Sequence, residues 1–118
     1  MLSVPDLVRI YVSMQPTDMR KGFDSLAAVV RDWLGGDPLS GHLFVFRSRR
    51  GDRVKLLWWD KDGLVQYYKR LEEGVFRFPA AADAETRSIE VSAQELSLVL
   101  RGIDPASVKR QKRYQYAG

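Results

Sequence analysis

From His42 to Leu71 the sequence reads HLFVFRSRRGDRVKLLWWDKDGLVQYYKRL, and this stretch decides the fold. Three runs of apolar or aromatic residues are separated by two turn signals, RGD at 50–52 and DKDG at 60–63. Links this short join antiparallel strands, because a parallel connection needs a crossover of a dozen or more residues. We therefore expect an antiparallel meander whose strands cover residues 42–47, 53–60 and 64–71.

A strand and a long helix are expected before the meander. Residues 6–13 (DLVRIYVS) are short, β-branched and aromatic, which is typical of a strand. Thr17 is a suitable N-cap for a helix over 18–34, and Gly35-Gly36 is a suitable end. Apolar residues follow the helical period at Met19, Phe23, Leu26, Val30 and Trp33.

The chain after the meander predicts further strands and a second helix. A short fourth run covers 75–78, and 87–91 is strand-like. Ser92 to Glu95 matches a capping box, so a helix should begin at about Ala93 and end at Gly102. The fold class is therefore α+β: an antiparallel meander sheet of four to six strands, one long helix packed on it and a shorter C-terminal helix. We expect a single domain over 1–104 and a basic, flexible tail over 105–118.

Composition limits the classes of function. The 118 residues include no cysteine and one histidine, which removes disulfides, thiolate metal sites and a cysteine nucleophile. We expect no metal and no cofactor. No apolar run is long enough to span a membrane, and the N-terminus lacks signal-peptide features, so a soluble, cytoplasmic protein is expected.

Positive charge is concentrated in two segments. Residues 47–55 (RSRRGDRVK) and 109–113 (KRQKR) each carry +4, while the whole chain carries +4, so the remainder is acidic. Clustered cations favour binding to a polyanion, because neutralised phosphates release counterions. The expected nucleic-acid-binding residues are Arg47, Arg49, Arg50, Arg53 and Lys55 in the hairpin and Lys109, Arg110, Lys112 and Arg113 in the tail. The alternative is that both segments are merely solvated.

Two further cations form a weaker candidate site. Arg20 and Lys21 fall in the first turn of the expected helix, where the helix dipole disfavours positive charge. An anion held by free backbone N–H groups and both side chains would explain their position.

The paired aromatics of the meander should divide between the two faces of the sheet. Consecutive strand residues point to opposite sides, so one tryptophan and one tyrosine should lie on the second face. There they would stack on bases, or bury against a helix or another subunit. The residues concerned are Trp58, Trp59, Tyr67 and Tyr68.

The long ordered strings of this chain resemble a known family. They are PTDMRKGFDSLAAVV (16–30), SGHLFVFRSRRGDRVKLLWWDKDGL (40–64) and YYKRLEEGVF (67–76). Together they are similar to the small accessory protein, TnpB or second open reading frame, of bacterial insertion-sequence family sixty-six. The resemblance spans residues 4–103, and Ser48 departs from it by standing where glycine is common. It implies a transposition accessory encoded beside a larger, separate transposase.

No residue set predicts catalysis. The turn around Asp60 and Asp62 suits a tight hairpin better than a two-metal site, although these acids together with Asp18 and Asp24 leave that site conceivable. His42 is more typical of a structural side chain, and Ser25 and Ser40 have no base partner.

The sequence as a whole favours a non-catalytic accessory protein for DNA transposition that binds DNA mainly through phosphates. Its expected partners are DNA of the insertion-sequence ends, the transposase of the same element and a second copy of itself, with no membrane contact. The alternative is a protein-interaction module that docks on the transposase or self-associates through exposed aromatics.

Overall fold

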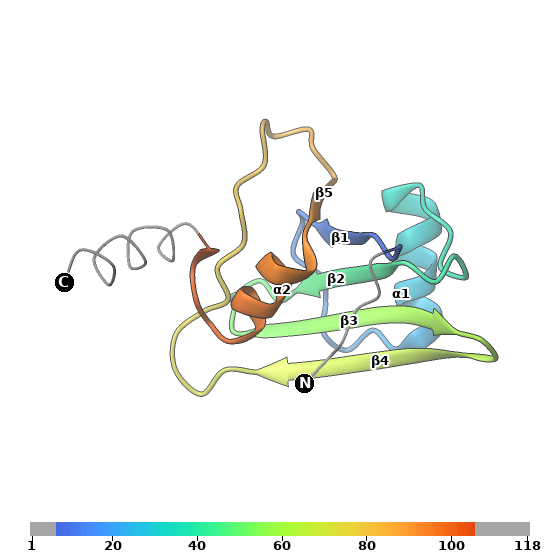
Figure 1. Ribbon diagram of the computed structural model, residues 1–118, viewed down its shortest axis with the longest axis horizontal. Helices are drawn as coiled ribbons and strands as arrows, with labels where there is room; N and C mark the ends of the chain where they lie inside the picture. The colour runs from blue at the N-terminus through green and yellow to red at the C-terminus, as the bar shows by residue number, and fades with distance from the viewer. Residues whose placement is uncertain (1–6, 106–118) are drawn as a thin grey trace.

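Five strands and two helical segments make up the computed structural model, which describes residues 7–105 (Figure 1). The strands lie side by side in the order β4-β3-β2-β1-β5, so β4 and β5 are the edges. The elements are β1 (Ile10–Ser13), α1 (Phe23–Val29), the π-helical turn η1 (Val30–Leu34), β2 (Leu43–Arg47), β3 (Arg53–Asp60), β4 (Gly63–Arg70), β5 (Ser88–Val91) and α2 (Ala93–Leu100).

The expected meander is confirmed. β2 pairs antiparallel with β3, and β3 pairs antiparallel with β4 along its full length. Lys55 faces Phe46 on one side and Tyr68 on the other in this register. Because side chains alternate along a strand, these three residues lie on the same face of the sheet.

The expectation of a purely antiparallel sheet is wrong, because β1 runs parallel to β2. The link between these two strands contains α1 and η1, and a link with a helix is long enough for a parallel crossover. The last strand, β5, pairs antiparallel with the free side of β1. The sheet is therefore mixed, and its N-terminal strand lies between elements that are distant in sequence.

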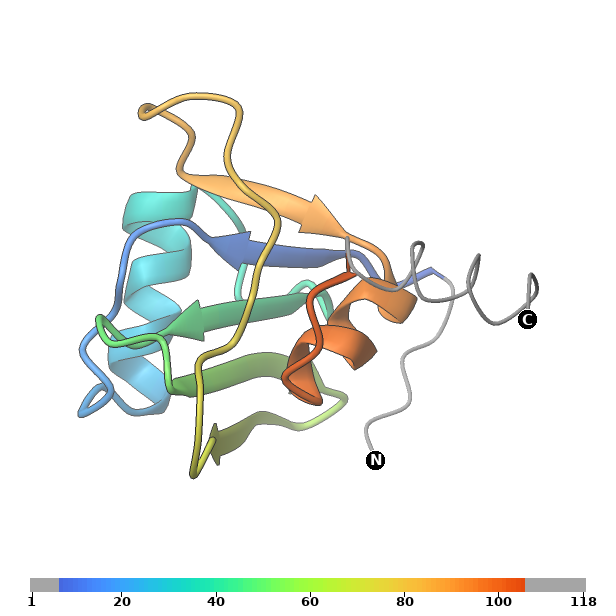
Figure 2. The same cartoon turned by 90° about the vertical axis from the view of Figure 1, so that its left-hand side faces the viewer.

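The expected strand over 75–78 is absent: the chain from Leu71 to Arg87 runs as a loop from β4 at one edge to β5 at the other (Figure 2). The Phe76 N–H donates to Gly51 O at 2.8 Å, so this segment is tied to the β2–β3 turn rather than to a sheet edge. The Phe76 side chain is buried among core residues.

The first helix begins at Phe23, not at Asp18 as the sequence suggested. Asp18 closes a turn of its own, since its carboxylate accepts the Arg20 N–H at 2.9 Å and its carbonyl accepts the Lys21 N–H at 3.1 Å. Gly22 then adopts an extended conformation, which a helix cannot include. The predicted end is confirmed, with Gly35 in the left-handed region at φ 69°.

The second helix begins where the capping box predicts. The Ser92 hydroxyl accepts the Glu95 N–H, and the Glu95 carboxylate accepts the Ser92 N–H, both at 3.0 Å. This helix and α1 cover opposite faces of the sheet (Figure 2). Each face therefore has its own core: Leu26, Val30 and Phe46 lie under α1, whereas Val12, Leu56 and Val99 lie under α2.

Candidate nucleic-acid interface

Arg49 and Arg50 lie in the turn between β2 and β3, and both are exposed. Backbone bonds close this turn, because the Ser48 N–H donates to Arg53 O at 2.9 Å and the Gly51 N–H donates to Ser48 O at 3.0 Å. The Ser48 hydroxyl also accepts the Arg53 N–H at 3.1 Å. Ser48 therefore helps to hold the turn.

The loop after β4 fixes this turn from its other side. The Leu71 N–H donates to Asp52 O, and the Phe76 N–H donates to Gly51 O, both at 2.8 Å. Gly51 has φ 81°, and a Cβ there would lie 3.4 Å from Val75. The two arginines are thus carried on a turn whose backbone is bonded to two neighbouring segments.

Two more arginines lie next to this turn, at the start of β3 and the end of β4. Arg53 faces Arg70 in the strand register, and Arg53 Nη1 lies 3.4 Å from the Tyr68 hydroxyl. Arg70 is half-exposed and forms an ion pair with Glu72 at 3.3 Å. The sequence analysis did not include Arg70. Pairing residues outward from the DKDG turn places Arg70 opposite Arg53.

The segment before α1 lies beside the β2–β3 turn (Figure 2). The Thr17 N–H donates to Arg47 O at 2.8 Å, and a cavity of about 260 Å³ is lined by Arg49 together with residues 16–18. Arg20 binds Asp18 through two nitrogens, the closer contact being 2.6 Å from Nη2 to Oδ2. This pairing lowers the pKa of Asp18 below its ordinary value of 3.8 and raises the pKa of Arg20.

Arg20 and Lys21 do not lie in the first turn of a helix. The prediction that they bind an anion at the start of a helix is therefore wrong. Both residues precede Gly22, which is the N-cap of α1. The structure places them instead in a turn beside the hairpin, with the charge of Arg20 matched by Asp18.

The expectation that Lys55 is a surface cation is also wrong, since only 5% of the residue is exposed. Its Nζ donates to Lys21 O at 2.8 Å and lies 4.6 Å from the centre of the Tyr68 ring. The strand alternation signals this position, because Lys55 lies between Phe46 and Tyr68 on the α1 face. Its ammonium group joins the β1–α1 loop to the sheet.

Arg47 is separated from the other hairpin cations. It faces Val54, a residue of the core under α2, so its side chain leaves the sheet on the face opposite Arg53. Arg47 Nη2 donates to Met14 O at 2.8 Å. Arg49 and Arg50 in the turn and Arg53 at the start of β3 thus remain candidates for one surface, whereas Arg47 lies on the opposite face and Lys55 is buried.

The paired aromatics divide between the faces as expected. Trp58 and Tyr67 pack against the core under α2, which is the helix-packing alternative. Trp59 and Tyr68 lie on the α1 face, where Tyr68 is 48% exposed and adjacent to Arg53. Of the four aromatic residues, Tyr68 therefore has an exposed ring next to a positively charged side chain, that of Arg53.

The acids of the β3–β4 turn belong to no metal-binding group of the described residues, and the histidine has structural contacts. Asp60 and Asp62 flank Lys61 in the β3–β4 turn, and within residues 7–105 no group of three or more His, Asp or Glu side chains is placed to hold a metal. The His42 Nδ1 accepts the Arg9 N–H at 3.0 Å, and its ring meets that of Tyr11 edge-on. The Ser40 hydroxyl accepts the His42 N–H at 3.1 Å.

The basic tail residues Lys109, Arg110, Lys112 and Arg113 lie outside the described residues. In the described part of the chain, no helix has the length and apolar character needed to cross a membrane.

Residues 8–110 match the profile of the family described as IS66 Orf2 like protein. The chain belongs to this family. Membership of the IS66 Orf2-like family implies an accessory role in transposition.

Two relatives come from Sinorhizobium fredii (strain NBRC 101917 / NGR234). The uncharacterized protein y4jC is 40% identical over 104 residues, covering 88% of this chain and 86% of its own. The uncharacterized protein y4hO is 44% identical over 97 residues, covering 82% of each chain. No solved structure matches.

Proposed function

We propose that this protein supports transposition by binding DNA, mainly through phosphate contacts made at the β2–β3 turn, and that it catalyses no reaction itself. The observation that supports this most directly is the pair of exposed arginines, Arg49 and Arg50, on a turn held by four backbone hydrogen bonds. A cation on a fixed backbone loses less conformational freedom when it binds a phosphate than one on a mobile loop.

Neighbouring side chains would extend the contact along a DNA backbone. Arg53 and Arg70 continue the positive surface from the turn along the α1 face. Tyr68 offers an exposed ring next to Arg53, which suits stacking on an unpaired base. Arg20 lies on the adjoining segment and would contribute less, because Asp18 already balances its charge.

The tail cations fit the same proposal as a second contact. Lys109, Arg110, Lys112 and Arg113 carry four charges within five residues. Such a segment would increase affinity without adding sequence preference, because phosphate contacts carry no sequence information. Family membership supports the proposal that the DNA bound is the ends of the insertion sequence. It also supports the transposase as the protein that acts on those ends.

The test measures anisotropy of labelled duplex and single-stranded DNA over a range of salt concentrations. Each phosphate contact on duplex DNA contributes about −0.9 to the slope of log affinity against log salt. We expect the Arg49→Ala/Arg50→Ala variant to reduce the magnitude of the slope by about 1.8. The matched control, Arg31→Ala/Arg101→Ala, removes the same charge from exposed positions elsewhere and should leave the slope unchanged.

Equal slopes for the two double variants would contradict the proposal, because binding would then depend on net charge alone. A slope near zero in the unaltered protein would contradict it too. That result would favour the protein-interaction alternative, for which Phe23 and Tyr68 are the exposed aromatic residues within 7–105. A complex formed through apolar surface should survive high salt, whereas one formed through screened charges should not.

A further inference from the structure

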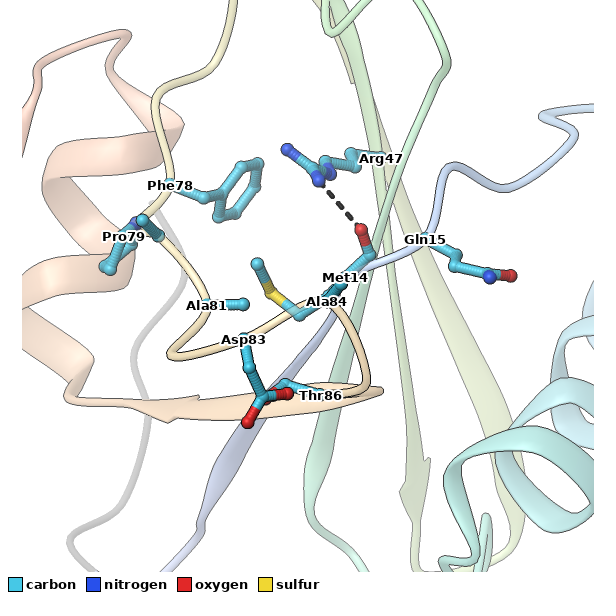
Figure 3. Close-up of a pocket in the computed structure, with 10 residues that line it drawn as sticks. Met14, Gln15, Arg47, Phe78, Pro79, Ala81, Asp83, Ala84 and Thr86 are labelled. Atoms are coloured by element: carbon cyan, nitrogen blue, oxygen red, sulfur yellow. Dashed lines mark hydrogen bonds between the residues drawn. The ribbon is translucent and has the colours of Figure 1, made fainter.

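A second candidate site lies on the other face of the sheet, around Arg47. A cavity of about 450 Å³ opens between the ends of β1 and β2 and the loop that leads into β5 (Figure 3). Its volume falls in the range of pockets that bind small ligands or a few residues of a peptide. The binding surface proposed above does not include any part of it.

The polar centre of this cavity is the guanidinium of Arg47. Its Nη2 donates to Met14 O at 2.8 Å, which anchors one end of the group. Its Nε is buried and has no hydrogen-bond partner among the described residues. Buried donors are nearly always paired, so the contacts made within the protein leave the guanidinium incompletely satisfied. Because Nε itself is covered, a ligand in the cavity would meet the guanidinium through its terminal nitrogens.

The nearest acid does not fill that position. Asp83 lines the same cavity, but its Oδ1 accepts the Glu85 N–H at 2.9 Å and the Thr86 hydroxyl at 3.1 Å. In Figure 3 the Asp83 carboxylate is turned toward Thr86 and away from Arg47. Asp83 therefore stabilises its own loop, and the charge of Arg47 remains available to a ligand.

One side of the cavity is apolar, while Gln15, Asp83 and Thr86 add polar groups elsewhere. Phe78 and Met14 pack against the core under α2 and extend into the cavity, so both are held in place. Pro79, Ala81 and Ala84 complete this side. A ligand that fits needs one anionic group for the guanidinium and an apolar group for the wall.

From this arrangement we propose that the cavity binds an acidic peptide segment of a partner protein, with a carboxylate on Arg47 and the adjacent apolar side chain against Phe78. A planar carboxylate matches the parallel N–H groups of a guanidinium. A nucleic-acid phosphate fits less well, because it has no apolar part to cover Phe78 and Met14, whereas a peptide places an apolar side chain beside its carboxylate.

The experiment uses the full chain, labelled with ¹⁵N and with ¹³C at the methionine methyl groups. The probes are N-acetyl-Glu-Leu-amide, the uncharged analogue N-acetyl-Gln-Leu-amide, and thymidine monophosphate. We expect the Glu-Leu probe to shift both the Arg47 Nε–H signal and the Met14 methyl signal saturably, at a Kd of about 1 mM. The Gln-Leu probe should bind about tenfold or more weakly, because it lacks the charge-assisted hydrogen bonds.

Two variants separate binding from folding. Arg47→Lys keeps the charge but loses the planar donor pair, so the affinity for the Glu-Leu probe should fall about tenfold. Ala81→Leu fills the cavity from the opposite wall and should abolish the shifts while the Arg47 signal persists. Arg53→Lys, on the other face, is the matched control and should bind the probe normally.

Three outcomes would overturn the proposal: equal binding of the Glu-Leu and Gln-Leu probes, no shift at about 20 mM of the Glu-Leu probe, or tighter binding of thymidine monophosphate than of the peptide. The last would assign the cavity to a nucleotide phosphate. The DNA-binding proposal is tested separately, since Arg47→Lys should leave the salt slope for DNA unchanged.

Discussion

Arg47 and Lys55 illustrate how side-chain position separates cations that look equivalent in sequence. Each donates to a backbone carbonyl of the segment between β1 and α1, Arg47 to Met14 and Lys55 to Lys21. They do so from opposite faces of the sheet, because β2 and β3 alternate their side chains. A count of charges over 47–55 includes both residues, but neither contributes to the surface around Arg49 and Arg50.

The Asp18–Arg20 pair predicts a specific pH dependence. Because the pKa of Asp18 in the folded protein lies below 3.8, the pair stabilises the fold above that pH, and the contribution is lost as the pH falls through the folded-state value. We expect Arg20→Gln to move the pKa of Asp18 back toward 3.8. A ¹³C titration of the Asp18 carboxyl measures this, with Arg31→Gln as the control. An unchanged pKa in the Arg20 variant would contradict the assignment.

At the scale of elements, sequence signals that span a few residues located the second helix and the hairpin turns. The start of α1 and the cavity depend on contacts that such signals do not show. The Ser92–Glu95 capping box and the two hairpin turns lie within a few residues, so the sequence alone locates them. The start of α1 was missed because Asp18 bonds to the Arg20 side chain and Thr17 to the distant Arg47. The cavity was missed because loop 71–87 contributes most of its wall.

The β2–β3 turn predicts a measurable cost for one substitution. Gly51 has φ 81°, and an added Cβ would also lie 3.4 Å from Val75. We expect Gly51→Ala to lower the free energy of unfolding by about 1–2 kcal/mol in urea denaturation. Gly63→Ala is the matched control, since Gly63 is not in the left-handed region and has nothing within 4 Å of the added atom. It should not lower the free energy of unfolding, because alanine loses less conformational freedom than glycine in a strand. Equal effects would show that the turn tolerates a side chain.

At the scale of the whole molecule, one sheet joins two cores. The core under α2 takes residues from four strands, from α2 and from the loop, whereas the core under α1 depends on one helix. The sequence predicted the helices and the meander but not the parallel pairing of β1, because that pairing depends on contacts between distant segments. Both cores share the same central strands, so we expect them to unfold together.

A single change in α2 tests this coupling. Leu96 is 2% exposed, and Leu96→Ala should lower the free energy of unfolding by about 2–4 kcal/mol. The urea transitions followed by circular dichroism and by tryptophan fluorescence should still coincide. Leu39, which is 55% exposed, provides the control: Leu39→Ala should change stability by less than about 0.5 kcal/mol. Separate transitions would mean that the two cores are independent units.

The position of β1 between β2 and β5 has a consequence for synthesis on the ribosome. β1 is made first, but the strand that covers its outer edge ends at Val91, and the helix that completes its core follows that strand. At typical rates of translation, on the order of 4–15 s separate the first strand from the last. During that interval the backbone of β1 is an open edge that another nascent chain can pair with. Protection of the newly made protein against aggregation therefore depends on translation reaching β5.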